Sequence, residues 1–215
     1  MDVYSVLARV DALVAGLAEG TPGWPVPRAS DASPLDEEYS RCPDPAKYRV
    51  TGVRAEAWAT ALVELGLATV EPVDDLTSLW RDEGGHRDVP VVRAWRLRAE
   101  VAGTLPLLLC STSFSGAEGN GTLVGAGDPA VFVAALPVCG CDACDHGSAQ
   151  LLADLDEAVL DVVTGAMVEV RAPEGWVRRR RNGSVRSGYG EPDAMLADAV
   201  AGRSPYPMLM GAPWW

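Results

Sequence analysis

The amino-acid sequence predicts an α+β fold, in which a mainly antiparallel sheet of about five to seven strands has helices packed on one face. The first observation is the order of the periodic segments: two helices, several strands, a helix, a hairpin and a last helix. The second is that only the helical segment 148–164 is long enough to join two parallel strands. A chain of 215 residues can bury one good core, so we expect a single domain over 1–215.

Two helical segments in the N-terminal third are separated by a proline-rich stretch. Apolar residues recur at three- and four-residue steps over 2–19 and again over 45–66, as in helices with one buried side. The stretch between them, 20–45, contains six prolines and predicts an extended wrap over the surface. We expect Trp24 and Tyr39 to anchor this wrap.

Most of the predicted strands lie in the middle of the chain. They are expected over 67–73, 89–101, 105–110, 123–124 and 130–136. The consecutive apolar residues of 130–136 predict a central strand that is covered on both faces. We expect the polar, glycine-rich segment 111–121 to be a loop. It does not predict a phosphate-binding loop, because glycine and proline at 125–129 prevent a following helix and no lysine is present.

After the strands, Ser148 is expected to cap the helix 148–164. Its acidic residues recur at three- and four-residue spacing and predict a solvated face: Asp154, Glu157 and Asp161. A strand over 166–171, a hairpin over 176–189 with an Asn-Gly turn and a helix over 191–202 complete the predicted elements.

Four consecutive arginines occupy positions 178–181 in the predicted hairpin. Because neighbouring side chains of a strand point to opposite faces, one pair is expected to bind acidic residues of the same domain. A ribbon that binds phosphate or nucleic acid is the alternative. The tail over 203–215 contains three prolines and cannot be helical, so it is expected to pack into a groove of the same domain or to dock on a partner.

The composition indicates a protein of the cytoplasm. The net charge of −12 argues against broad binding to nucleic acid or anionic membranes, and it favours a basic protein partner. The chain shows no export signal and no apolar run of the roughly 18 residues that a membrane span needs. We therefore expect the five cysteines to be reduced or metal-bound rather than paired in disulfides.

Three of the cysteines and one of the two histidines lie within eight residues, between the strand 130–136 and the helix 148–164. The pattern C-x-C-x2-C of Cys139, Cys141 and Cys144, followed by His146, predicts a metal site for which zinc is the expected ion. Four ligands so close in sequence would be strained, so other residues are equally good candidates for the fourth ligand. These are Cys42, Cys110 and His86.

Two other interpretations of the cysteines stay open. Cys141 and Cys144 form a C-x-x-C pair beside a helix N-terminus, an arrangement that can lower a thiol pKa for redox chemistry. The neighbouring Asp142 and Asp145 act against a thiolate. Free cysteines are also commonly small buried apolar residues without chemistry.

The segment CGCDACD, the following GS and helix, the preceding GAGDPAVFVAALP and the chain end GAPWW resemble an uncharacterised actinobacterial protein family of unknown function. The resemblance covers nearly the whole chain. It implies a bacterial, cytoplasmic protein, and it supplies no catalytic residue because no activity is assigned to the family.

Two functional hypotheses follow. Because the sequence lacks a nucleophile elbow, a dinucleotide fingerprint and an H-E-x-x-H motif, the first is a non-enzymatic binding or regulatory domain of the immunity-protein type. It would carry a structural metal or thiol cluster. The alternative is a thiol- or metal-dependent enzyme that uses Cys139, Cys141 and Cys144, with His146 as ligand or base.

Overall fold

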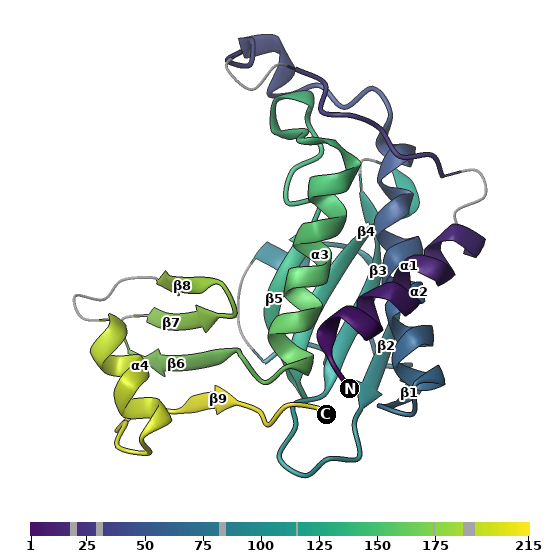
Figure 1. The fold of residues 1–215 in the computed structure, drawn as a ribbon. Helices are drawn as coiled ribbons and strands as arrows, with labels where there is room; N and C mark the ends of the chain where they lie inside the picture. Colours follow the sequence, from purple (N-terminus) through teal and green to yellow (C-terminus); the bar gives the residue numbers. More distant parts are fainter. Residues whose placement is uncertain (18–20, 29–31, 82–84, 115, 174, 187–191) are drawn as a thin grey trace.

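The computed structural model describes residues 1–17, 21–28, 32–81, 85–114, 116–173, 175–186 and 192–215. This part of the chain contains four α-helices and two antiparallel sheets, so the predicted α+β class is confirmed (Figure 1). The strands are divided between a five-stranded and a four-stranded sheet, where the sequence predicts a single sheet. The end of the predicted hairpin, 187–189, lies outside the described residues, and one domain over 1–215 stays a prediction.

The five-stranded sheet has the strand order β1-β2-β3-β4-β5, and each neighbouring pair is antiparallel. Its strands are β1 (Thr69–Pro72), β2 (Val91–Arg98), β3 (Leu107–Phe114), β4 (Ala117–Gly127) and β5 (Ala130–Leu136). Three helices lie on one side of it: α1 (Val3–Leu17), α2 (Arg49–Glu64) and α3 (Gly147–Val163). α2 and α3 contact the strands, and α1 packs on α2.

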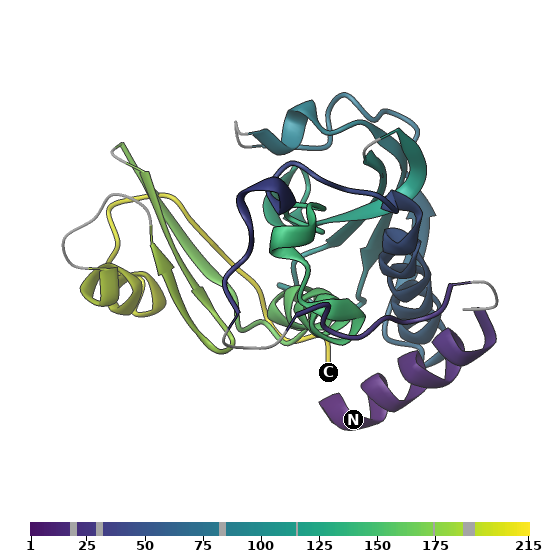
Figure 2. The same ribbon diagram turned by 90° about the horizontal axis from the view of Figure 1, so that it is seen from above.

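Both faces of this sheet are covered, because alternate residues of each strand pack on different layers. Leu107 and Leu109 of β3 pack against the helices, whereas Leu108 packs against the segment 73–90 on the other face. Figure 2 shows this segment, with the short 3-10 helix η3 (Gly85–Asp88), across the sheet from α3. The predicted covering of β5 on both faces is therefore correct, but β5 is an edge strand and not a central one.

The segment 111–121, predicted to be a loop, instead extends β3 and begins β4. Its buried Asn120 accepts a hydrogen bond from the backbone N–H of Phe114 and donates to the carbonyls of Phe114 and Pro45. The polar side chains of this hairpin are thus satisfied by backbone groups, one of which is distant in sequence. Local polarity gives no sign of such a partner, and this explains why the prediction was wrong.

The four-stranded sheet has the order β8-β7-β6-β9 and is also antiparallel. Its strands are β6 (Val168–Ala172), β7 (Gly175–Arg180), β8 (Gly183–Arg186) and β9 (Met208–Met210). The helix α4 (Pro192–Val200) covers one face, where Leu196 and Ala199 pack on apolar residues of β6 and β7. Because α3 leads from β5 to β6, it connects the two sheets and does not join parallel strands within one sheet.

Two arginines of β7, the buried Arg178 and the partly exposed Arg180, join the second sheet to the rest of the molecule. Arg178 donates to the carboxylate of Glu169 and to the carbonyl of Phe132 in β5. Arg180 donates to Asp161 of α3 through its Nε atom at 2.5 Å. The prediction that one side of the arginine run pairs with acidic residues is confirmed.

The acidic residues of α3 are only partly as predicted. Asp154 is exposed, in agreement with a solvated face. Asp161 is completely buried and accepts hydrogen bonds from Arg180 and from the backbone N–H of Arg181. Glu157 pairs with the Arg181 side chain. Two of the three acidic residues therefore form ion pairs with the hairpin, where the sequence predicts contact with solvent.

The C-terminal tail packs against its own chain. Beyond β9, which pairs with β6, the backbone N–H of Trp214 donates to the carbonyl of Val163 and its indole Nε1 donates to the carbonyl of Leu105 at 3.2 Å. The Trp214 side chain is buried. The tail therefore packs on its own chain, as in the first of its two predicted destinations, and it also adds a strand, β9, that the sequence did not predict. Among the described residues, the helices are all too short or too polar to cross a membrane.

Candidate metal centre

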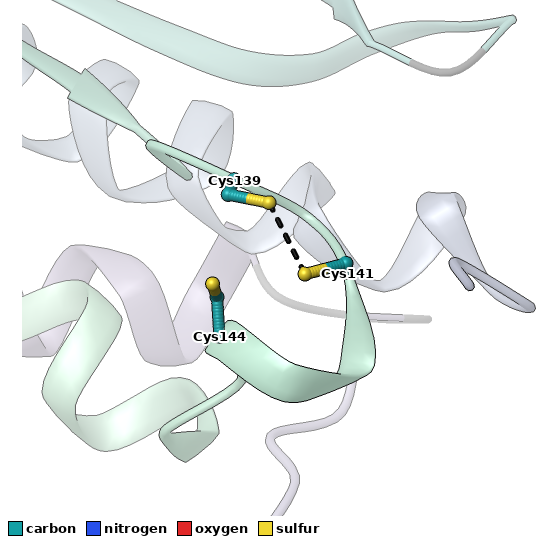
Figure 3. Close-up of side chains that lie close together, drawn as sticks. All are labelled: Cys139, Cys141 and Cys144. Carbon is teal, nitrogen blue, oxygen red and sulfur yellow. Dashed lines mark hydrogen bonds between the residues drawn. The ribbon is translucent and has the colours of Figure 1, made fainter. Parts of the chain in front are cut away.

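Three cysteine side chains converge in the turn between β5 and α3. The Sγ atoms of Cys139, Cys141 and Cys144 all lie within 4.8 Å of one another, and those of Cys139 and Cys141 are 3.2 Å apart (Figure 3). Cys141 is buried and the other two are exposed. The convergence agrees with the C-x-C-x2-C spacing, and it gives a metal ion three sulfur ligands from one short segment.

Close packing at Gly140 shapes this turn. A Cβ atom at position 140 would lie 2.1 Å from Cε1 of Phe114 in β3, so only glycine fits without displacing the ring. Tyr48, at the end of the 3-10 helix η2 (Pro45–Tyr48), meets the Phe114 ring edge to face and donates its hydroxyl to the Gly140 carbonyl at 3.2 Å. Cys139 and Cys141 therefore flank Gly140, whose position is fixed by the Phe114 ring and the Tyr48 hydroxyl.

The short 3-10 helix η4 (Asp142–Cys144) places the third sulfur near the other two. Burial alone would raise the pKa of the Cys141 thiol, but hydrogen bonds from the Cys139 side chain and from the backbone N–H of Cys144 lower it. The side-chain hydrogen bond with Cys141, together with burial, raises the pKa of Cys144 to about 11. These hydrogen bonds therefore make the thiolate, which is the form that binds metal ions, easier to reach for Cys141 than for an isolated cysteine.

The proline-rich wrap crosses over this turn. Trp24 and Ser148 exchange hydrogen bonds: the backbone N–H of Trp24 donates to Ser148 Oγ at 2.9 Å, and the backbone N–H of Ser148 donates to the Trp24 carbonyl at 3.1 Å. The Arg28 guanidinium donates to the carbonyl of Asp142 at 2.7 Å. Trp24 is therefore an anchor of the wrap, as predicted, whereas Tyr39 is exposed.

The carboxylate of Asp145, and not the hydroxyl of Ser148, accepts a hydrogen bond from a backbone N–H at the beginning of α3. The helix begins at Gly147, whose backbone N–H donates to Asp145 Oδ1 at 2.8 Å, while the Ser148 side chain is engaged with the wrap. Asp145 also accepts hydrogen bonds from Lys47 Nζ at 2.5 Å and from Trp24 Nε1 at 2.9 Å. The predicted cap at Ser148 is wrong, because the wrap takes its hydroxyl and a carboxylate three residues earlier takes its place.

This network leads to a prediction for acid pH. Burial alone would raise the pKa of Asp145, but the hydrogen bonds from Lys47 and Trp24 hold it below its usual value of 3.8. A carboxylate with a lowered pKa in the folded state stabilises the protein above its unfolded pKa, and that contribution is lost as pH falls through the folded pKa. We expect Asp145→Asn to lower the free energy of unfolding at neutral pH by about 1–3 kcal/mol.

Urea denaturation of both proteins between about pH 7 and pH 2 provides the measurement. The free energy of unfolding of Asp145→Asn is expected to fall less steeply below the unfolded pKa than that of the unchanged protein, because the variant has no carboxylate at this position to protonate. Parallel pH profiles for the two proteins would show that Asp145 makes no net contribution.

The residues named as possible fourth ligands lie in different places. Cys110 is in the apolar layer under the segment 73–90, where burial raises its pKa to about 12. His86 stacks on Phe132 of the same layer, with ring centroids 4.6 Å apart. Both belong to the sheet face opposite the helices. In the part of the chain that the structure describes, the close group of potential ligands contains the three sulfurs without Cys42 or His146.

His146 and Cys42 both lie beside the cysteine turn. His146 immediately precedes α3, is exposed, and borders a pocket of about 230 Å³ together with Cys139 and Cys144. Cys42 is half-buried in the wrap, directly after Arg41, whose carbonyl accepts a hydrogen bond from the backbone N–H of Asp142 at 2.8 Å. These two residues are therefore the neighbours from which a fourth ligand can come.

The pocket beside the sulfurs has a mixed lining. Apolar groups include Val138 and Leu151, and the polar groups include Gln150 and Asp154. It opens to solvent, and two of the three sulfurs border it. A pocket of this size is large enough for a small molecule next to the sulfurs of Cys139 and Cys144.

Some residues that shape the site could not be identified from the sequence. Lys47 is the only lysine of the chain, and its ammonium also lies 5.3 Å from the centre of the Trp24 ring. Arg28 is one of many arginines and has no distinctive neighbours in the sequence. The single lysine was the one available signal, but it does not indicate a partner about a hundred residues away.

A comparison with protein families gives one match: a family model described as a family of unknown function, DUF6226, matches residues 10–214. The matched range includes the wrap, the cysteine turn and the tail. Comparison with curated proteins gives no match. Comparison with solved structures also gives none.

Proposed function

This chain belongs to the DUF6226 family of unknown function, so its role has to be inferred from its own residues, and we propose that it is a zinc-binding protein. Cys139, Cys141 and Cys144 are the proposed ligands. The observation that carries the proposal is the convergence of three sulfurs within 4.8 Å. Soft thiolate ligands favour zinc over magnesium or calcium, and three of them from one turn leave a fourth position for another residue.

We further propose that the zinc is structural, in a non-enzymatic binding or regulatory domain. The turn connects the first sheet, α3 and the wrap, so an ion there would fix three parts of the fold at once. The chain carries a net charge of −12, which suits a basic protein partner, and several of its arginines are already paired with acidic residues. The free cysteines suit the reducing cytoplasm of a bacterium, the setting that the family resemblance implies.

The first test is the zinc content of the protein. We expect about one zinc per chain after purification, and Cys141→Ser to lower the affinity for zinc by more than about 100-fold because a direct ligand is lost. Elemental analysis and competition with a coloured chelator measure these quantities. Cys110→Ala is the matched control, since it removes a thiol from the opposite face of the sheet and should keep the zinc.

A protein that contains no zinc, and that does not take up added Zn²⁺, would contradict the proposal. Equal losses of zinc in Cys141→Ser and Cys110→Ala would also contradict it. In that case the metal would depend on the general stability of the fold and not on the cysteine turn.

A second function, a thiol- or metal-dependent enzyme, is favoured by one observation. Cys139 and Cys144 border the same open pocket as His146 and Asp154, which could act as base or ligand beside a bound molecule. Iodoacetamide alkylation of zinc-free protein separates the two functions. A native thiol that reacts with an apparent pKa below about 7.5 supports the enzyme. Cysteines that react only after unfolding contradict it.

A further inference from the structure

We propose that Cys42 is the fourth zinc ligand, so that the site is a four-cysteine centre which fastens the proline-rich wrap to the turn between β5 and α3. The inference rests on the proposed zinc function and adds a residue about a hundred positions away from the other three ligands. It replaces His146, the ligand that the sequence predicts from proximity along the chain.

The wrap is bound to the cysteine turn on the N-terminal side of Cys42. Just before Cys42, the Arg41 carbonyl accepts the backbone N–H of Asp142 at 2.8 Å, and the Arg41 side chain donates to the Asp142 carboxylate at 2.6 Å. Asp142 lies between Cys141 and Cys144 in η4. Cys42 is therefore covalently attached to a residue whose backbone pairs with the cysteine turn itself.

Two further contacts hold the chain that follows Cys42. Lys47 donates to Asp145, and the hydroxyl of Tyr48 donates to the carbonyl of Gly140, which lies between Cys139 and Cys141. The wrap is thus fixed to the turn both before and after Cys42. Rotation about the Cα–Cβ bond from one staggered rotamer to another is the movement open to its sulfur.

Charge also favours Cys42 as the ligand. Zinc bound by four thiolates leaves a net charge of −2, which needs positive groups close by. Arg28 directs its guanidinium at the carbonyls of Asp142 and Ala143. Arg41 and Lys47 pair with the carboxylates of Asp142 and Asp145, the two acidic side chains of the turn. All three come from the wrap and η2. The chain around Cys42 therefore neutralises the acidic side chains of the turn, which would otherwise oppose the thiolates.

His146 is less suited to complete the same site. It is exposed at the beginning of α3 and borders the open pocket, whereas Cys42 is half-buried in the wrap. A ligand set of Cys139, Cys141, Cys144 and His146 would occupy eight consecutive residues and leave the wrap unconnected. Structural zinc sites usually take ligands from separate segments of the chain, as the set with Cys42 does.

X-ray absorption spectroscopy of the zinc-loaded full chain tests the proposal. We expect four sulfur ligands at about 2.3 Å in the unchanged protein and in His146→Ala, and three sulfurs with one lighter atom in Cys42→Ser. Cys42→Ser should also lower the zinc affinity at least about tenfold. Cys42→His serves as a second variant, since imidazole binds zinc and should restore tight binding with a three-sulfur, one-nitrogen set at about 2.0–2.1 Å for the nitrogen.

Hydrogen exchange provides a readout that does not depend on spectroscopy. Removal of zinc by a chelator should increase hydrogen exchange over 32–48, the second half of the wrap and η2, in the unchanged protein. It should have little effect on the same residues of Cys42→Ser. Cys110→Ala is again the control for loss of a thiol.

The possible failures are distinguishable. If the unchanged protein binds zinc through three sulfurs and one nitrogen, and His146→Ala changes that set while Cys42→Ser does not, this inference is overturned and the proposed zinc function stands. If the unchanged protein binds no zinc, the proposed function itself fails. The inference would also be overturned if zinc-loaded Cys42→Ser and the zinc-loaded unchanged protein gave the same X-ray absorption spectrum.

Discussion

Glu169→Ala is expected to lower the free energy of unfolding by about 3–5 kcal/mol, because it leaves a buried arginine without its carboxylate. Arg178 and Glu169 side chains are 6% and 1% exposed, and Arg178 Nε donates to Glu169 Oε2 at 2.9 Å. The same guanidinium donates to the carbonyl of Phe132 in β5. The pair therefore stabilises the second sheet and its attachment to the first at the same time.

Urea denaturation followed by circular dichroism measures this effect. The matched control is Glu71→Ala, which breaks an exposed pair with Arg98 in β2, where the two side chains are 52% and 41% exposed. An exposed pair contributes about 0–1 kcal/mol, so the control should change little. Glu169→Gln keeps an acceptor and should fall between the two. A loss for Glu169→Ala no larger than that of Glu71→Ala would show that Arg178 finds a new partner or reaches water.

A second large effect is expected for Asp156→Ala, with a loss of about 3 kcal/mol in the free energy of unfolding. Asp156 of α3 accepts two hydrogen bonds from Arg54 of α2, at 2.9 and 2.6 Å, and one from Trp58 Nε1 at 2.7 Å. Arg54 is 7% exposed and Trp58 is fully buried. After the substitution, Arg54 keeps Asp11 of α1, an exposed carboxylate, and the Trp58 N–H loses its acceptor.

Asp154→Ala is the control for this prediction, since Asp154 is on the same helix and accepts a hydrogen bond from the exposed Gln150. We expect a change within about 0.5 kcal/mol for Asp154→Ala in thermal or urea unfolding. If the two aspartate variants lose equal stability, helix propensity explains the effect and the three-helix ion-pair cluster does not. If both variants keep their zinc, the ion-pair cluster of Asp11, Arg54 and Asp156 is independent of the metal centre.

The positions of the helices along the chain could be predicted from the sequence because the signal for a helix is local. Apolar residues at three- and four-residue steps predicted α1, α2 and α3 to within a few residues, and alternation predicted β2. Proline and glycine marked the end of α4 and the extended tail. The spacing of Cys139, Cys141 and Cys144 belongs to the same kind of signal, since residues two and three apart on a tight turn have little freedom to separate.

The errors occur where one segment meets another that is distant in the chain. Asn120 satisfies a hairpin that was expected to be a loop, and Asp161 of α3 is buried and pairs with Arg180 of the second sheet. Ser148 gives its hydroxyl to the wrap, and β5 is an edge strand although its composition is that of a central one. In each case the local pattern gives the polarity of a residue but not the identity of its partner.

The sequence by itself determined the α+β class, the helices and a turn in which three sulfurs lie close together, because short-range periodicity and spacing limit the local backbone. The tertiary structure decided the division into two sheets, the partners of the buried arginines and the position of Cys42 beside the cysteine turn. Those features depend on which distant groups satisfy a buried charge, a backbone carbonyl or a strand edge. Such partners are selected by the free energy of the whole fold, and no neighbouring residue specifies them.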